Sequence, residues 1–356
     1  MASSPLDQYG RPLGVLRLSL TARCNLACPY CLPDGEDPPD LLTGEERALL
    51  VKIAVDLGVH TLRLTGGEPL LHQGLERLIR ALGPLRQSIE AKPHHLGVPS
   101  GLRQIALTTN GVLLTQQRAR ALKDAGLDRI TISLDGADGA SVARMAGSGG
   151  GAKSGEALLK KVLAALEHAR EAGFDPESGA LKLNAVITRD GNQDQLIPLA
   201  TVARQRGVEL RLIEFMDVGN RNGWKAGAVL PAAEMVERIG RHWPLEPLGR
   251  DQHGTASRWR YRDGGGLVAV VASVSEPFCG DCNRLRITAD GLAYTCLFAA
   301  SGRDLRPWLR PQPDLPGLRH AVRELWSLRS DRYSEERAEL ATTRRLRPAE
   351  MAYLGG

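Results

Sequence analysis

The chain has 356 residues, a formal net charge of +5 and a pI near 9.0. No run of about 18 or more apolar residues occurs, which excludes a membrane span, and the opening MASSPLDQYGRP lacks the apolar core of an export signal. The length fits one α/β barrel of about 200 to 250 residues with an elaboration. The basic charge leaves a nucleotide, a nucleic acid or a plain solvated surface open as its explanation.

Short apolar segments alternate with amphipathic ones over the first two thirds of the chain. The pattern predicts strands at residues 15–20, 61–64, 104–107, 129–134, 181–187 and 209–213. Between them it predicts helices at residues 43–58, 75–82, 115–125, 155–172 and 193–206. Thr43, followed by Glu45 and Glu46, is the expected N-cap of the first of these helices.

Repeated strand–helix alternation indicates parallel βα units joined by right-handed crossovers. Six units are fewer than a closed barrel uses. We therefore expect an α/β fold, an incomplete (βα)6 TIM-type barrel over residues 1–216, whose open side is covered by a C-terminal α+β region over 217–356. Strands at 257–262 and 267–271 and a helix at 316–328 are expected in that second region.

The six cysteines form two sets of three: Cys24, Cys28 and Cys31, then Cys279, Cys282 and Cys296. Three disulfides are disfavoured, because that framework is typical of short secreted chains. A structural zinc site normally takes four ligands. Three thiolates hold three corners of a 4Fe-4S cluster and leave one iron open, so two reactive clusters are the favoured interpretation.

The first cysteine loop follows the first predicted strand, and active sites of βα folds lie at the C-terminal ends of strands. Its C-x3-C-x2-C spacing, with Tyr30 before the last cysteine, resembles the signature of the radical S-adenosylmethionine (SAM) superfamily. The segment Thr65-Gly-Gly-Glu68-Pro69 resembles the glycine-rich element that holds the amino group of SAM. Glycines permit close backbone approach to a ligand, and the carboxylate of Glu68 suits an ammonium group. Alone, this segment is also compatible with an ordinary turn.

The second cysteine set resembles the GTP 3′,8-cyclase family, which catalyses the first step of molybdenum cofactor biosynthesis. The resemblance covers essentially the whole chain and includes 16–19 (LRLS), 108–111 (TTNG), 132–135 (ISLD), 182–184 (KLN), 213–220 (IEFMDVGN) and 275–286 (SEPFCGDCNRLR). Departures from the family pattern are insertions around 91–103 and 147–155. Neither touches a motif, and the SGGG run of the second is expected to form a mobile tip.

The resemblance implies two 4Fe-4S clusters held by the two cysteine sets, the first binding SAM and the second taking the guanine of GTP. The implied SAM contacts are Tyr30, Gly67, Ser133 and Met216. The implied GTP contacts are Arg17, Arg63, Thr108 (chosen over Thr109), Lys182, Arg284, Leu285 and Arg286. The final Gly355 and Gly356 resemble a tail that reaches into the active site, with Arg17 as the expected neighbour and a catalytic role for all three.

The residues agree with this assignment, since Arg17 and Lys182 project from otherwise apolar strands and buried charges demand partners. Surface exposure or a salt bridge is the alternative for each. The implied lyase reaction begins with reductive cleavage of SAM to a 5′-deoxyadenosyl radical, which takes a hydrogen atom from C3′ of GTP. Attack on C8 and reduction then give 3′,8-cyclo-7,8-dihydro-GTP.

Expected partners are GTP, an electron donor and, by hand-over, the next pathway enzyme, cyclic pyranopterin monophosphate synthase. No nucleic acid or membrane is expected, and the protein is predicted to be a cytoplasmic monomer or homodimer. The sequence disfavours two rival functions. A peptide-modifying radical SAM enzyme would use more C-terminal cysteines. A zinc-stabilised nucleic-acid-binding protein would need a second ligand pair and interleaved aromatics, which the sequence lacks.

Overall fold

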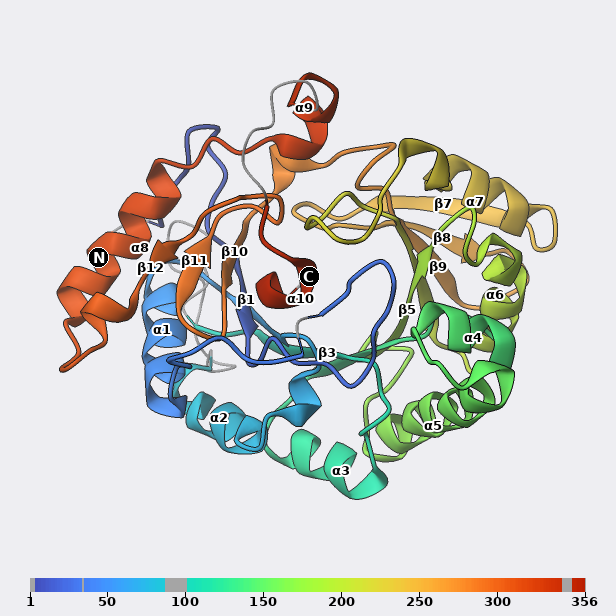
Figure 1. Ribbon diagram of the computed structural model, residues 1–356, viewed down its shortest axis with the longest axis horizontal. Helices are drawn as coiled ribbons and strands as arrows, with labels where there is room; N and C mark the ends of the chain where they lie inside the picture. The colour runs from blue at the N-terminus through green and yellow to red at the C-terminus, as the bar shows by residue number, and fades with distance from the viewer. Residues whose placement is uncertain (1–3, 34, 87–100, 341–347, 356) are drawn as a thin grey trace.

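The computed structural model describes residues 4–33, 35–86, 101–340 and 348–355, and it places their strands in one curved sheet (Figure 1). The strands run β12-β11-β10-β1-β2-β3-β4-β5-β6-β9-β8-β7 across that sheet. Their bounds are β1 Val15–Ser19, β2 Thr61–Thr65, β3 Gln104–Thr109, β4 Arg129–Ser133, β5 Leu181–Ile187, β6 Glu209–Glu214, β7 Leu245–Arg250, β8 Ser257–Tyr261, β9 Leu267–Val271, β10 Arg284–Ile287, β11 Leu292–Tyr294 and β12 Arg303–Asp304.

The six strands predicted from the first two thirds of the chain are neighbours in sequence order and pair in parallel. The C-terminal part then extends this sheet at both edges, because β10 pairs in parallel with β1 and β9 pairs in parallel with β6. The outer strands β11, β12, β8 and β7 are antiparallel. The edge strands β12 and β7 lie at opposite ends of this order and do not pair with each other in the described structure. The barrel is therefore incomplete, as predicted.

The helices that connect the parallel strands lie on the outside of the sheet (Figure 1). Their bounds are α1 Gly44–Asp56, α2 Leu75–Ala81, α3 Gln116–Asp124, α4 Gly139–Met145, α5 Gly151–Glu171 and α6 Leu196–Gln205. Thr43 is the N-cap of α1 and forms a capping box, in which its hydroxyl accepts from Glu46 N while the Glu46 carboxylate accepts from Thr43 N.

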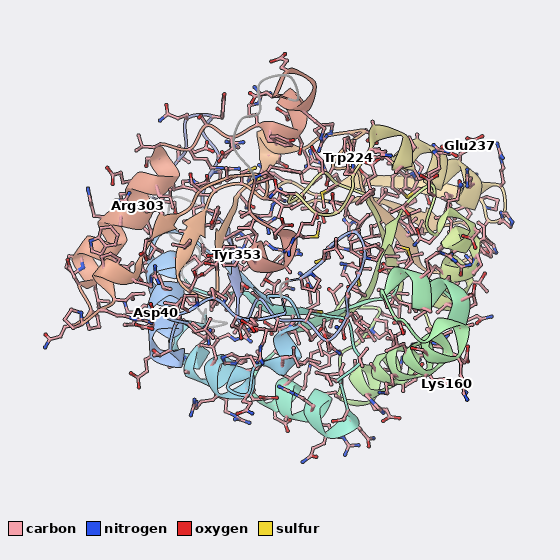
Figure 2. All side chains as sticks on the ribbon, in the orientation of Figure 1. Asp40, Lys160, Trp224, Glu237, Arg303 and Tyr353 are labelled. Atoms are coloured by element: carbon pink, nitrogen blue, oxygen red, sulfur yellow. The ribbon has the colours of Figure 1, made fainter. Side chains whose placement is uncertain are left out.

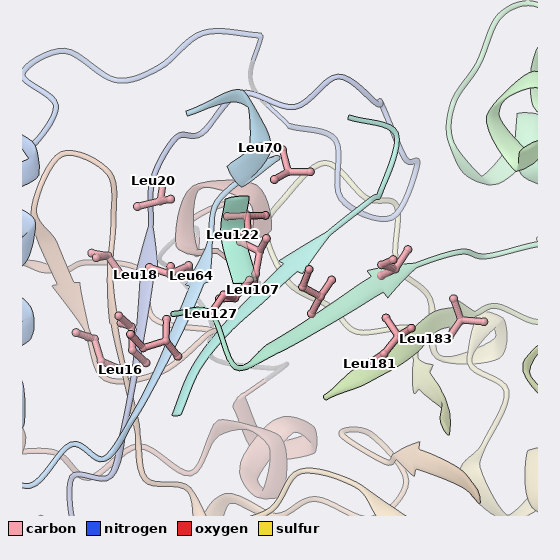
Figure 3. Close-up of a cluster of buried hydrophobic side chains, with 14 of the residues drawn as sticks. Leu16, Leu18, Leu20, Leu64, Leu70, Leu107, Leu122, Leu127, Leu181 and Leu183 are labelled. Atoms are coloured by element: carbon pink, nitrogen blue, oxygen red, sulfur yellow. The ribbon is translucent and has the colours of Figure 1, made fainter. Parts of the chain in front are cut away.

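Alternation along the parallel strands separates an apolar outer face from a polar inner face. Leu16, Leu18, Leu64 and Leu107 are fully buried between the sheet and its helices (Figure 3). Residues of opposite parity point the other way, because successive side chains of a strand alternate between the two faces. This arrangement commits the leucines to the core and directs the charged residues, Arg17 among them, into the barrel.

The insertion around 147–155 is a loop only in part: residues 147–150 form the turn between two packed helices, and residues 151–155 belong to the second helix. The mobility of the SGGG run stays a prediction. α5 begins at Gly151, four residues before the predicted start, and α4 was not predicted. A side-chain carbon at Gly155 would lie 1.8 Å from the Gly139 carbonyl oxygen, so the glycines allow the helices to touch. Next to this insertion, Ala27 of the cysteine loop donates from its backbone to the Ala146 carbonyl at 3.1 Å. Residues 91–100 of the other insertion lie outside the described part of the chain.

The C-terminal part adds the helices α7 Ala232–Gly240, α8 Leu315–Ser327, α9 Tyr333–Leu340 and α10 Met351–Leu354. The short helix α10 lies inside the curved sheet rather than on its outer face (Figure 1), and Tyr353 is near the centre of the view in Figure 2. The chain therefore returns to the barrel interior after building its outer layer. None of the described helices is long and apolar enough to cross a membrane.

Candidate functional site

The first cysteine set lies on the loop that follows β1, at the C-terminal end of the parallel sheet. Backbone bonds tie this loop to the turn after β2: Gly67 N donates to Thr21 O at 2.8 Å and Glu68 N donates to Arg23 O at 2.8 Å. A side-chain carbon at Gly67 would lie 2.2 Å from the Arg23 carbonyl oxygen. The two loops thus approach so closely that only glycine fits at position 67.

The three thiols of this loop border one cavity together with every residue expected to contact SAM. Its lining includes Cys24, Cys28, Cys31, Tyr30, Gly67, Ser133 and Met216. Burial raises the pKa of Cys24 and Cys28 above the ordinary thiol value, and burial with the neighbouring Cys24 raises that of Cys31 to about 12. At Cys31 burial outweighs the opposing effect of the Arg221 cation, and a cationic iron centre would supply the stabilisation that thiolates need.

Glu68 has a structural role that the sequence did not indicate. Its carboxylate is buried and accepts hydrogen bonds from Leu70 N at 2.9 Å, Thr109 Oγ1 at 2.7 Å and Asn110 N at 2.8 Å. Asn110 in turn donates to the side chain of Asn25 beside Cys24 at 2.8 Å. The Glu68 carboxylate, which the sequence suggested for the amino group of SAM, therefore fixes the loop after β3. The same hydrogen bonds explain the presence of Thr109.

Tyr30 is held by a second buried carboxylate. Its hydroxyl donates to Asp135 Oδ2 at 2.6 Å, and the backbone N–H of Val186 donates to the other oxygen at 2.8 Å. Burial raises the pKa of Asp135 to about 6. The aromatic residue of the cysteine loop is thereby anchored across the barrel to β4 and β5.

The second cysteine set borders a larger cavity in the barrel mouth. Its lining includes Cys279, Cys282, Cys296, Arg17, Arg63, Thr108, Arg284, Arg286 and Arg329. Burial alone raises the pKa of Cys282, but Arg284 and Arg329 outweigh it and lower that pKa to about 6. Burial and Asp331 raise the pKa of Cys296 to about 12.

Three arginines stand side by side on adjacent strands of this cavity. Register pairs Arg17 of β1 with Arg286 of β10 on one side and with Arg63 of β2 on the other. Arg284 lies two residues before Arg286 and therefore on the same face. Neighbouring strands are about 4.8 Å apart, so the guanidinium groups form a closely spaced row of positive charge.

This row has no acidic counterpart among the described residues: none of its four arginines forms an ion pair with a carboxylate, and Arg63 Nε has no hydrogen-bond partner there. Burial and the neighbouring arginines lower the pKa of Arg17 and Arg63 well below the usual value, and that of Arg286 to about 10. Buried cations in such an arrangement call for an anionic ligand.

Of the remaining predicted GTP contacts, some border the cavities and others do not. Thr108 borders both cavities, whereas Thr109 is bound to Glu68, so the choice between them agrees with the geometry. Leu285 is fully buried on the outer face, because it alternates with Arg284 and Arg286. Lys182 is absent from the described cavity wall, and its Nζ pairs with Glu209 at 2.7 Å. These two residues are not brought to the cavity.

The C-terminal tail reaches the arginine row. The carbonyl oxygen of Gly355 accepts from Arg17 Nε at 3.0 Å and Nη2 at 2.7 Å. Gly355 has a φ of +65°, and a side-chain carbon there would lie 2.2 Å from Thr65 Oγ1. Arg17 is thus the neighbour that the sequence predicted for the tail. Gly356 lies outside the described residues, so its part of the prediction stays untested.

The two cavities meet inside the barrel. Thr108, Asn184, Ile213 and Met216 belong to the linings of both. A group held at the first cysteine set and a molecule held at the second would therefore meet across these four side chains. The arrangement suits a reaction in which a reactive species made in one cavity acts on a substrate in the other.

Comparison with known proteins decides the family. Residues 18–201 match the Radical SAM superfamily model and residues 208–335 match Molybdenum Cofactor Synthesis C. The chain is 60% identical over 355 residues to the GTP 3′,8-cyclase of Synechococcus sp. (strain CC9902), covering 100% of this chain and 99% of that protein. The chain belongs to the GTP 3′,8-cyclase family. It is also 44% identical over 365 residues to the cyclase of Xanthomonas campestris pv. campestris (strain B100), covering 100% and 99%.

A solved structure shares the fold of this cyclase family member. Streptococcus suis SuiB superposes with a TM-score of 0.58 at 13% identity, covering 93% of this chain and 69% of that one. At such low identity the likeness shows the fold alone. It agrees with the incomplete barrel and its C-terminal elaboration.

The residues present fit the cofactors of the family, two 4Fe-4S clusters and SAM. Each set of three thiols borders its own cavity, and none of the six cysteines forms a disulfide in the described part of the chain. Three thiolates per cluster leave one iron for an outside ligand. The cysteines on the loop after β1 would hold the SAM-binding cluster, and Cys279, Cys282 and Cys296 would hold the second.

Proposed function

We propose that this chain converts GTP to 3′,8-cyclo-7,8-dihydro-GTP, using SAM and an electron donor, as the first step of molybdenum cofactor biosynthesis. The observation that carries the proposal is the arginine row of Arg17, Arg63, Arg284 and Arg286 beside the second cysteine set. Guanidinium groups form bidentate bonds with phosphate. A triphosphate in the row would bring its nucleoside next to the second cluster and toward the SAM cavity.

When bound, the first cluster and SAM supply a 5′-deoxyadenosyl radical, and the second cluster supplies an open iron for the substrate base. The chain positions these groups. Tyr30, Gly67, Ser133 and Met216 would contact SAM, and their common cavity supports that assignment. Asp135 fixes Tyr30 in place through the bond to its hydroxyl.

The barrel walls would orient GTP and keep water away from the reacting carbon. Thr108 and Met216 lie at the junction of the cavities, between the two cofactor sites. The tail closes the row from one side, since Gly355 O is bonded to Arg17. An enclosed site restricts side reactions of a radical. The catalytic assignment of Arg17, Gly355 and Gly356 and the GTP contacts of Lys182 and Leu285 belong to this proposal.

Further parts of the proposal concern the cell. We infer a cytoplasmic enzyme, active as a monomer or homodimer, that hands its product to cyclic pyranopterin monophosphate synthase. The identity of the electron donor is left to experiment. The division of the chain at residues 216 and 217 is likewise a proposal, supported by the parallel core formed before it.

The decisive experiment is an anaerobic assay of the reconstituted protein with reductant, SAM and GTP. We expect roughly eight iron atoms per chain and formation of 5′-deoxyadenosine that depends on GTP. Cys296→Ser is expected to retain the first cluster, with roughly four irons, and to lose GTP turnover.

Three results would contradict the proposal. Colourless protein with one or two zinc atoms would remove the cluster assignment. Formation of 5′-deoxyadenosine with a peptide but not with GTP would favour the peptide-modifying function. Full GTP turnover by Cys296→Ser would remove the role of the second cysteine set.

A further inference from the structure

A buried group of charges lies behind the second cysteine set and is not used by the proposed chemistry. Asp7 and Arg11 belong to the segment before β1, and Arg329 follows α8. The side chains of Arg11 and Arg329 are 2% exposed and that of Asp7 is 0% exposed. The Asp7 carboxylate joins them, at 2.5 Å from Arg11 Nε and 3.3 Å from Arg329 Nη1.

The two arginines donate hydrogen bonds to the backbone of the cysteine ligands themselves. Arg11 Nη1 donates to the carbonyl oxygen of Cys279 at 2.6 Å and to that of Asp331 at 2.9 Å. Arg329 Nη1 donates to the carbonyl oxygen of Cys282 at 2.7 Å. Both cysteines of the C-x2-C pair are therefore fixed through their main chain by one charge network.

Asp7 is itself rigidly held, so that it can orient the guanidinium groups. Its Oδ1 accepts from the backbone N–H of Arg11 at 2.9 Å and of Tyr9 at 3.0 Å. Trp326, fully buried in α8, donates from Nε1 to the Arg11 carbonyl at 3.0 Å. The N-terminal segment is thereby locked onto α8, and the planar guanidinium of Arg11 is aimed at the cysteine loop.

Position separates Asp7 and Arg11 from the substrate site. Arg329 borders the second cavity, whereas Asp7 and Arg11 are not among its lining residues. Their influence on the site must pass through the cysteine loop. A cluster ligand set works only when its thiolates are held in the geometry of the metal centre, and outer partners supply that orientation.

We propose that Asp7 and Arg11 are positioning residues for the second 4Fe-4S cluster, acting through the main chain of Cys279 and Cys282. This inference rests on the two-cluster function proposed above. A lysine at position 11 keeps the charge but has one nitrogen, which cannot occupy both the Nε position that binds Asp7 and the Nη1 position that binds the two carbonyls. Selective loss of the second cluster is the consequence that a purely structural salt bridge would not produce.

The test compares Arg11→Lys and Asp7→Asn with the wild-type chain after anaerobic reconstitution. We expect iron to fall from roughly eight atoms per chain toward roughly four, the value of Cys296→Ser. The electron paramagnetic resonance signal of the SAM-binding cluster and the binding of SAM should persist. Arg303→Lys is the matched control, because Arg303 Nη1 binds Glu324 at 2.7 Å and the Ala321 carbonyl at 3.3 Å at the edge of the molecule (Figure 2).

The outcomes separate the two proposals. Variants that keep both clusters would overturn the positioning role, and so would variants that lose both clusters in parallel, because that result marks a general folding role. Asp7→Asn preserves side-chain shape and covers the case in which Arg11→Lys does not fold. A wild-type chain with roughly four irons would instead overturn the two-cluster function itself.

Discussion

Cationic side chains of the barrel interior differ in whether the protein neutralises them. Lys182 and Arg211 share Glu209, each at 2.7 Å. The arginine row has no such acid among the described residues, and the nearest partner of Arg17 is a neutral carbonyl, that of Gly355. Binding of an anion should therefore stabilise the folded chain, because a ligand that binds only the native state shifts the folding equilibrium.

The pH dependence of GTP binding tests the contact assigned to Lys182. Burial and the nearby Arg211 lower the pKa of Lys182 to about 8, against its usual value near 10.5. The ammonium is therefore present below pH 8 and is lost as the pH rises through 8. If it binds the triphosphate, Kd for GTP should rise about tenfold between pH 7 and pH 9, as for loss of one charge-assisted hydrogen bond. Isothermal titration at fixed ionic strength measures it.

Lys182→Arg is the control for this titration. It keeps the charge at all these pH values, so the change in Kd should disappear. A wild-type Kd that stays constant from pH 7 to pH 9 would show that Lys182 serves Glu209 and not the substrate, in keeping with its absence from the described cavity wall.

Helix α10 is the element that carries the tail into the barrel, and polar bonds hold both of its ends. Tyr353 donates its hydroxyl to both carboxylate oxygens of Asp290, at 3.0 and 2.9 Å. At the other end, the Glu350 carboxylate accepts from Asn220 N at 3.1 Å. The helix has only four residues, too few to be stable alone, so these bonds fix its position.

Removing the tyrosine anchor should release the tail. Tyr353→Phe deletes the bond to Asp290 and leaves that buried carboxylate with one fewer donor, a loss of about 1 to 3 kcal/mol. We expect faster amide exchange over residues 351–355 and a GTP turnover reduced about fivefold or more. Tyr294→Phe is the control, since Tyr294 packs edge-on against Tyr353 and forms no hydrogen bond to Asp290 in the described part of the chain. Equal effects of both substitutions would reject the anchor.

The capping box of α1 gives a prediction about stability. Thr43→Ala removes the acceptor for Glu46 N and should cost about 1 kcal/mol, or roughly a fivefold rise in amide exchange within α1. Thr115→Ala provides the comparison, because Thr115 caps α3 through one bond to Arg118 N at 3.2 Å and lacks the reciprocal one. Unchanged amide exchange within α1 in Thr43→Ala would contradict the contribution assigned to the Thr43 hydroxyl.

Elements with a strong local pattern were predictable, and those that depend on distant partners were not. Most of the six parallel strands alternate leucine or isoleucine with polar residues, and their observed ends lie close to the predicted ones. By contrast, β10 is a short strand defined by pairing with β1, and α10 is stabilised by contacts with Asp290 and Asn220. Gly151 was assigned to the loop insertion and not to a helix, because glycine at the start of a helix looks the same in sequence as glycine in a turn.

The same distinction holds within the site. The cysteines and the residues that share a cavity with the first cysteine set were predictable, because each lies in a short contiguous motif. Three interactions become visible only in the folded chain. Thr109 and Asn110 donate hydrogen bonds to Glu68, and Lys182 pairs with Glu209. Arg11 donates a hydrogen bond to the carbonyl oxygen of Cys279. Each joins segments far apart in sequence, and no local pattern encodes such pairs.

On the scale of the whole molecule, electrostatics should separate the two ligands. GTP would meet an arginine row that has no acidic partner among the described residues, whereas the SAM cavity has Glu68 on its wall and no arginine among its lining residues. We expect raising the salt from 50 to 500 mM to weaken GTP binding about tenfold or more and SAM binding much less. Equilibrium dialysis of both ligands at each salt concentration checks this, and equal weakening would contradict it.

The register between β1 and β10 has a consequence for how the substrate site comes into existence during folding. Val15 pairs with Arg284, 269 positions later (284 − 15). A shift of one residue would turn Arg284 and Arg286 toward the helices and bring Leu285 inward. The nucleotide site therefore forms only after the strand pairing with the largest sequence separation in the described sheet. Contacts of high sequence separation form slowly. A nascent chain synthesised only up to residue 216 would contain the complete cysteine loop after β1, but it would not bind GTP.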